Sequence, residues 1–141
     1  MRYFDYELAT FLFVDGQKTG LGTMLAQSKS IADAKPVAVA SRSTSLAEMA
    51  YPQLDLEAAS LDFGLRRFRE YLVGSPTIIK VVTDHKPLVP VFNGRRNCSI
   101  RTQRIKLKHQ DIPVVVEYQK GSLNRADIMS RQAKPLVIFE Y

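Results

Sequence analysis

The sequence predicts an α/β fold, a mixed five-stranded sheet flanked by helices, with the first three strands antiparallel and the last two parallel. Two observations lead to this class. Short apolar and β-branched runs separated by polar turns fill the first third of the chain, which is typical of consecutive strands. From residue 52 onward a helical spacing of apolar residues gives way to further strand-like runs, and this alternation favours a sheet covered by helices.

Length and composition indicate one globular domain. The chain has 141 residues, of which 45% are hydrophobic and 24% charged, a composition that excludes a disordered protein. Its net charge of +6 makes nucleic acid the first anionic partner to consider. The only cysteine, Cys98, excludes an internal disulfide and a multi-cysteine zinc site. Asp5 and Glu7 interrupt any signal peptide, and no apolar window could span a bilayer, so we expect a soluble intracellular protein without a membrane partner.

The strand predictions follow from the apolar runs in chain order. "TFLFVD" at 10–15 and "GLGTMLAQ" at 20–27 form an expected hairpin, and "KPVAVASR" at 35–42 is the third strand. "TIIKVVTD" at 77–84 and "IPVVVEY" at 112–118 are the fourth and fifth.

The helix predictions rest on spacing and on terminal signals. Apolar residues recur at intervals of three and four across 52–72, which predicts a helix that buries one face. Pro52 suits its first position and Gly74 its end. The remaining helical segments are 99–110, 123–131 and a short helix or turn at 85–94.

We expect residues 1–132 to form the domain. The tail at 133–141 is either an edge strand or the junction to a neighbouring domain.

Acidic residues stand at the ends of two predicted strands. Asp15 ends "FLFVD" and Asp84 ends "KVVTD", so both carboxylates meet at one edge if these strands are parallel neighbours. Glu57 falls at the margin of the apolar stripe of helix 52–72, and Asp127 belongs to the helix at 123–131. For each residue a structural role remains open, as a turn cap for the aspartates or as a partner of a distant arginine for Glu57.

Together these four carboxylates would make an all-oxygen site. Such a site suits hard divalent cations, Mg²⁺ first and Mn²⁺ as a substitute. Without a cation, crowded carboxylates would repel one another.

The order of motifs resembles the ribonuclease H domain of reverse transcriptases from Ty3/gypsy-type long-terminal-repeat retrotransposons. The resemblance covers residues 4–131 and rests on "FVDGQKTGLGTMLAQ", "KPVAVASRSTSLAEMAY", "LDLEAASLDFGLRRFREYLVG", "VVTDHKPLVPVFN", "SIRTQRIKLK" and "VEYQKGSLNRADIMSR". The chain departs from the family pattern at Ile105, where a tryptophan is usual, and in "DGQ", where "DAS" is typical. It also lacks the loop histidine that assists turnover in cellular and retroviral ribonucleases H, with Gln119 or Lys120 nearest to that place.

The resemblance implies a function. It assigns the catalytic, metal-binding quartet to Asp15, Glu57, Asp84 and Asp127 and implies two Mg²⁺ ions that cleave the RNA strand of an RNA/DNA hybrid. The expected partners are the hybrid and the polymerase domain of the same polyprotein, in the cytoplasm or in retroelement particles, and the oligomeric state stays open. An alternative is a weak or inactive module of the same fold that positions a polymerase. An integrase-like nuclease is disfavoured because Glu57 lies between the first two aspartates.

A basic segment without acids runs through residues 95–108. We expect part of it to contact the hybrid, Arg101 and Arg104 first, although acids elsewhere could neutralise it. The expected nucleic-acid-binding residues are Arg95, Arg96, Arg101, Arg104, Lys106, Lys120 and Asn124.

Four other residues are expected to lie outside the site. His85 should shape the turn after its strand, and His109 should be a surface residue. Asp55 and Glu48 should lie off the buried face of the helix.

Overall fold

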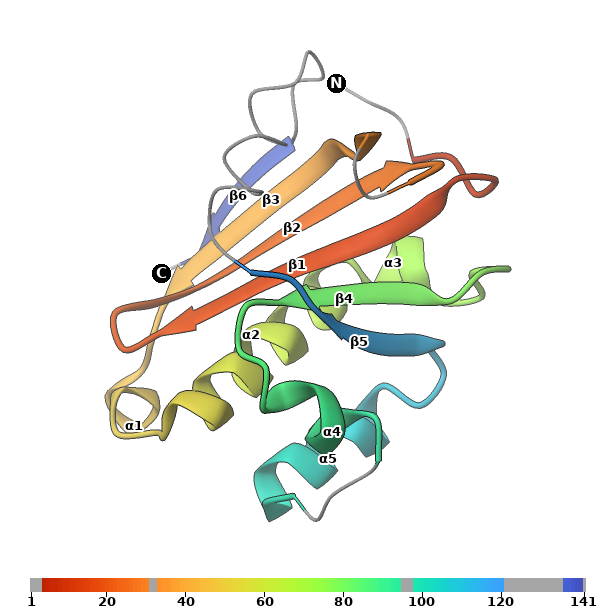
Figure 1. Ribbon diagram of the computed structural model, residues 1–141. Helices are drawn as coiled ribbons and strands as arrows, with labels where there is room; N and C mark the ends of the chain where they lie inside the picture. Colours follow the sequence, from red (N-terminus) through yellow and green to blue (C-terminus); the bar gives the residue numbers. More distant parts are fainter. Residues whose placement is uncertain (1–3, 31–32, 95–97, 121–135, 141) are drawn as a thin grey trace.

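In the part of the chain that the structure describes, the fold is a six-stranded mixed sheet with helices packed against one of its faces (Figure 1). The computed structural model describes residues 4–30, 33–94, 98–120 and 136–140. The strands are β1 Ala9–Gln17, β2 Gly20–Ser28, β3 Lys35–Ser43, β4 Ile79–Thr83, β5 Val114–Tyr118 and β6 Leu136–Glu140. The helices are α1 Leu46–Met49, α2 Gln53–Arg67, α3 Arg69–Leu72, α4 Leu88–Phe92 and α5 Ile100–Lys108.

The strand order is β5-β4-β1-β2-β3-β6. Strands β1, β2 and β3 are antiparallel, while β4 is parallel to β1 and β5 is parallel to β4. This confirms the predicted five-stranded arrangement. Strand β6 adds a sixth member, parallel to β3, so the part of the tail that the structure describes is an edge strand. The expected domain boundary at residue 132 lies outside the described residues and stays a prediction.

The central helix is shorter than its apolar spacing predicted. Helix α2 ends at Arg67, and Phe68 has φ −104° and ψ 17° before α3 begins. Leu65, Phe68 and Leu72 are all buried, so the apolar period continues through the break and gives no sign of it. Gly74 does follow the helical segment, with a φ of 75° that favours glycine.

Helix α2 lies unusually close to the sheet. A Cβ on Gly16 would overlap the backbone carbonyl of Leu56, and one on Gly64 would lie 2.5 Å from Oγ1 of Thr23. Glycine at both positions therefore lets the helix approach β1 and β2 closely. Among the described residues, none of the helices has the length and apolar character needed to cross a membrane.

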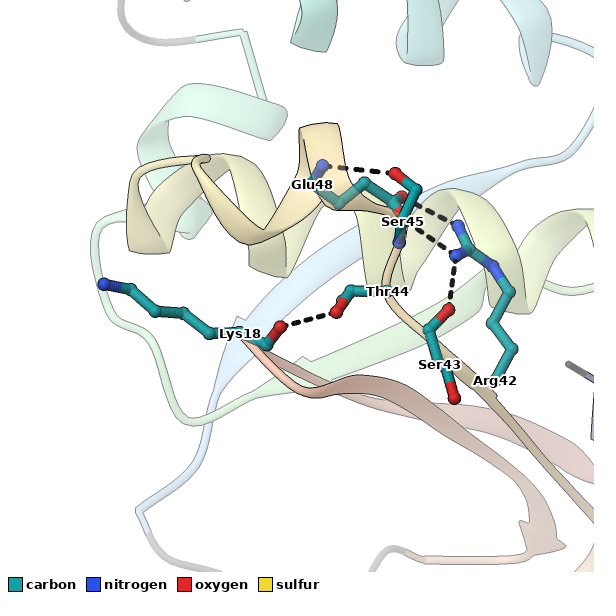
Figure 2. A network of polar contacts seen from close by, with 6 residues as sticks. All are labelled: Lys18, Arg42, Ser43, Thr44, Ser45 and Glu48. Atoms are coloured by element: carbon teal, nitrogen blue, oxygen red, sulfur yellow. Dashed lines mark hydrogen bonds and ion pairs between the residues drawn. The ribbon is translucent and has the colours of Figure 1, made fainter.

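A polar network fixes the segment that joins β3 to α2 (Figure 2). Arg42 donates from both terminal nitrogens to the Glu48 carboxylate, at 2.7 and 2.8 Å, and Ser45 and Glu48 form a capping box at the start of α1. Thr44 donates its hydroxyl to the carbonyl of Lys18, which ties this segment to the β1–β2 turn. The hydrogen bonds from Arg42 lower the pKa of Glu48 to about 2. Glu48 lies off the buried face of α2, as expected, because it belongs to a separate helix.

Candidate active site

Three of the four predicted acids converge at one edge of the sheet. Phe13 pairs with Val82 in the parallel β1–β4 register, so two residues later Asp15 and Asp84 emerge from neighbouring strands. Glu57 reaches the same place from the second turn of α2, and one carboxylate oxygen from each acid lies within 4.8 Å of the others. The fourth acid, Asp127, lies outside the described residues.

The three carboxylates differ in exposure. Glu57 is only 1% exposed, Asp15 is half-buried and Asp84 is exposed. The cluster is therefore anchored on a buried carboxylate and opens to solvent at Asp84, which leaves a side from which a ligand can approach.

Hydrogen bonds orient both oxygens of Glu57. Its Oε1 accepts from the backbone amide of Gly16 and from the side-chain amide of Gln53, each at 3.2 Å, and its Oε2 accepts from the hydroxyl of Thr83 at 3.3 Å. Gln53 also donates to the carbonyl of Gly16 at 2.7 Å. These donors come from β1, α2 and β4, so the position of Glu57 depends on all three elements.

This donor set fits a hard divalent cation. All three groups are carboxylates, and one of them is buried, where an ionised carboxylate needs a cation or several donors. Like charges at this separation repel one another, and a bound cation would relieve the repulsion. The geometry therefore agrees with the Mg²⁺ or Mn²⁺ site expected from the sequence, without identifying the ion.

Sequence reasoning did not single out Thr83. Its side chain is fully buried, and its hydroxyl both donates to Glu57 and accepts from the backbone amide of His85 at 3.0 Å. It thus links one acid of the cluster to the turn that follows Asp84. The sequence signal that could have identified Thr83 was its position directly before Asp84. His85 contributes to this turn through its backbone amide.

Some of the basic side chains of α5 form ion pairs within the protein. Arg101 pairs with Asp55 at 2.6 Å and its guanidinium lies 3.8 Å from the centre of the Tyr51 ring, while Ser99 donates to Asp55 at 3.3 Å. The expectation that Asp55 lies off the buried face is wrong, since it is 8% exposed. The reason is that α5 packs on the side of α2 that the sequence pattern left to solvent.

His109 is also buried, at 4% exposure, and the expectation of a surface residue is wrong. Its Nε2 lies 2.7 Å from Oδ1 of Asp62, and Lys108 donates to the same oxygen at 2.9 Å. Burial opposes ionisation of Asp62, but the hydrogen bonds from His109 and Lys108 outweigh it and lower the pKa of that carboxyl. Packing of α5 against α2 turns both residues toward this acid.

Of the other expected nucleic-acid-binding residues, the structure describes three. Arg104 and Lys120 are exposed and Lys106 is half-buried. Their contact with nucleic acid stays a prediction. The positions outside the described residues are Arg95, Arg96 and Asn124.

Comparison with known proteins identifies the family. The model of the RNase H-like domain found in reverse transcriptase matches residues 5–111. The chain belongs to this family. It is 32% identical over 132 residues to the retrovirus-related Pol polyprotein from transposon 412 of Drosophila melanogaster, covering 93% of this chain and 10% of that protein. The transposon Tf2-3 polyprotein of Schizosaccharomyces pombe is 29% identical over 133 residues, again with 93% and 10% covered.

The chain thus spans about a tenth of the length of these relatives. The predicted resemblance to Ty3/gypsy-type retrotransposon polyproteins is confirmed.

Solved structures agree on the fold of this RNase H-like domain. The foamy viral protease-reverse transcriptase in complex with double-stranded DNA superposes with a TM-score of 0.64 at 14% identity, covering 85% of this chain and 22% of that one. The RNase H1 named LC11, in complex with an RNA/DNA hybrid, gives 0.63 at 13% identity, covering 83% and 89%. At this identity the likeness establishes the RNase H fold alone.

Proposed function

We propose that this domain is a metal-dependent endoribonuclease that cuts the RNA strand of RNA/DNA hybrids during retroelement reverse transcription. The observation that carries the proposal is the convergence of Asp15, Glu57 and Asp84 within 4.8 Å at the sheet edge. The family assignment supports it, because the matched family is the RNase H-like domain of reverse transcriptases.

In this proposal Asp15, Glu57 and Asp84, with Asp127 as the fourth ligand, would hold two Mg²⁺ ions, and Mn²⁺ would substitute. When bound, such ions lower the pKa of an attacking water and stabilise the leaving 3′ oxygen. Glu57 serves as the fixed ligand because Gly16, Gln53 and Thr83 orient it.

The substrate class follows from how proteins distinguish RNA from DNA. The 2′ hydroxyls and the shallow, wide minor groove of an A-like duplex identify the RNA strand without reading its sequence. The products would carry a 5′ phosphate and a 3′ hydroxyl. The polymerase domain of the same polyprotein is the proposed partner that delivers the hybrid.

Cleavage of end-labelled RNA tests the proposal. We expect cutting only when the RNA is annealed to DNA and only with Mg²⁺ or Mn²⁺. Asp84→Asn should abolish it, and Asp33→Asn, an exposed aspartate outside the cluster, should not. Retained activity in Asp84→Asn would contradict the site assignment.

Metal titration by calorimetry separates the enzyme from a noncatalytic tether. A domain that binds the hybrid but neither binds Mn²⁺ nor cuts RNA would be the tether. A domain that binds Mn²⁺ in a manner dependent on Asp84 would have an intact metal site.

A further inference from the structure

A shallow cavity lies beside the acids, between the end of β5 and the segment after β4. Its volume is about 410 Å³ and its lining residues are Lys86, Pro87, Val89, Pro90 and Tyr118. None of the predicted site residues that the structure describes lines it.

The strand register places this cavity next to the acidic cluster. Tyr118 pairs with Thr83 across the parallel β4–β5 ladder, and the Thr83 hydroxyl contacts Glu57. Neighbouring strands lie about 4.8 Å apart, so Tyr118 is one strand away from the position that orients Glu57. Lys86, which follows Asp84 by two residues, lines the same cavity from the segment after β4.

The cavity combines one cation with apolar and aromatic surface. Tyr118 is 43% exposed, and the Nζ of Lys86 lies 5.8 Å from the centre of its ring. Among the described residues, no acid lines the cavity and no ion pair joins Lys86 to an acid. Within the described part of the chain, the Lys86 ammonium therefore lies near the face of an aromatic ring and has no acidic partner.

A ligand that matches this surface carries a negative charge next to a flat or apolar group. A nucleotide unit has both, because its phosphate attracts a lysine and its base or sugar packs on an aromatic ring. An acidic ligand without an apolar part would make no packing contact with Tyr118 or the prolines.

We propose that Lys86 and Tyr118 form a nucleotide-binding subsite. It holds the nucleic-acid strand next to the phosphodiester bond that is cut at the acidic cluster. Lys86 contacts a phosphate and Tyr118 packs against the adjoining sugar or base. This inference rests on the proposed function, because it assumes that a nucleic-acid strand lies across Asp15, Glu57 and Asp84.

The chain provides a matched control for Lys86. Lys80 is also exposed, and its Nζ lies 5.9 Å from the ring of Phe11. It belongs to β4 but precedes Asp84 by four residues, about 13 Å along an extended strand. Lys80→Gln therefore removes the same charge and the same kind of ring contact, away from the acids.

The test measures binding of a fluorescent RNA/DNA hybrid by anisotropy, with Ca²⁺ in place of Mg²⁺ to limit cleavage, at several salt concentrations. We expect Lys86→Gln to weaken binding several-fold and to reduce the slope of log K against log salt by about 1, as for one lost phosphate contact. Lys80→Gln should bind like the parent chain.

Tyr118→Leu should weaken binding of the hybrid without changing the salt slope, whereas Tyr118→Phe, which keeps the ring, should bind like the parent chain. Melting temperatures of all variants check folding, and Mn²⁺ affinity in Lys86→Gln should equal that of the parent.

The possible failures are distinct. If the parent chain does not bind the hybrid, the proposed function is contradicted, and the subsite with it. If the parent binds but Lys86→Gln and Lys80→Gln behave alike, the subsite alone is contradicted. Undiminished hybrid binding in both the Lys86 and Tyr118 variants would also overturn it and leave the cavity to a protein partner.

Discussion

Thr83 provides the most direct test of how the site is built. Thr83→Val keeps the β-branched shape that a strand favours but removes the hydroxyl. Two hydrogen bonds disappear, one to Oε2 of Glu57 and one from the backbone amide of His85, at a position that is fully buried. Leaving buried polar groups without partners costs about 1–3 kcal/mol, so we expect a loss of that size in the free energy of unfolding.

The effect on metal binding should exceed the effect of destabilisation alone. Groups that orient a metal ligand typically contribute about 10- to 100-fold in affinity, so Thr83→Val should weaken Mn²⁺ binding by about that factor. Thr83→Ser keeps the hydroxyl and should restore most of the affinity.

Calorimetric titration with Mn²⁺ and urea denaturation measure the two effects. Thr10→Val is the matched control, because Thr10 is a buried residue of β1 whose hydroxyl accepts from Gln27 at 3.0 Å, away from the acids. It should lose stability and keep its metal affinity. Parent-like Mn²⁺ affinity in Thr83→Val would refute the view that this hydroxyl orients Glu57.

Three further perturbations test other contacts. Gly16→Ala should cost about 1–3 kcal/mol in urea denaturation, because its Cβ would overlap a backbone carbonyl of α2, and parent-like stability would contradict this close approach. Arg101→Gln should cost about 1 kcal/mol, since its pair with Asp55 is partly exposed, and a double-mutant cycle with Asp55→Asn should show coupling rather than additive losses. Because Arg42 lowers the pKa of Glu48 from 4.5 to about 2, this pair stabilises the fold above pH 4.5 and its contribution is lost as the pH falls through 2. As the pH falls from 4.5 to 2, the melting temperature of Arg42→Gln should therefore fall less steeply than that of the parent chain. Parallel pH profiles of the two proteins would contradict this contribution of the ion pair.

The strand ends were the most predictable part of the site. Apolar runs that stop at Asp15 and Asp84 identify both residues locally, and parallel pairing of their strands then brings the carboxylates together. Glu57 was predictable from its place at the margin of the apolar stripe, because the helical period is regular. The hydrogen bonds that orient Glu57 were not predictable, since its donors Gly16 and Thr83 lie far from it in the sequence.

The two errors about individual side chains concern the side of α2 that faces away from the sheet. Asp55 was expected off the buried face and His109 on the surface, and both are buried. A single helix pattern separates an apolar face from a polar one but does not show whether a second helix covers the polar face. Helix α5 does so here, with Arg101 and Lys108 neutralising the acids that it covers.

The sequence alone determined local features of this protein: the order of the first five strands, the positions of the central and the basic helix, three of the carboxylates at element ends or margins, and the retrotransposon family. Each of these rests on short runs of residues close in the chain. The tertiary structure decided which elements touch. It packed α5 on α2, added β6 beside β3, and placed Tyr118 next to Thr83. Such contacts join residues far apart in sequence and depend on how whole surfaces fit together, which no local pattern encodes.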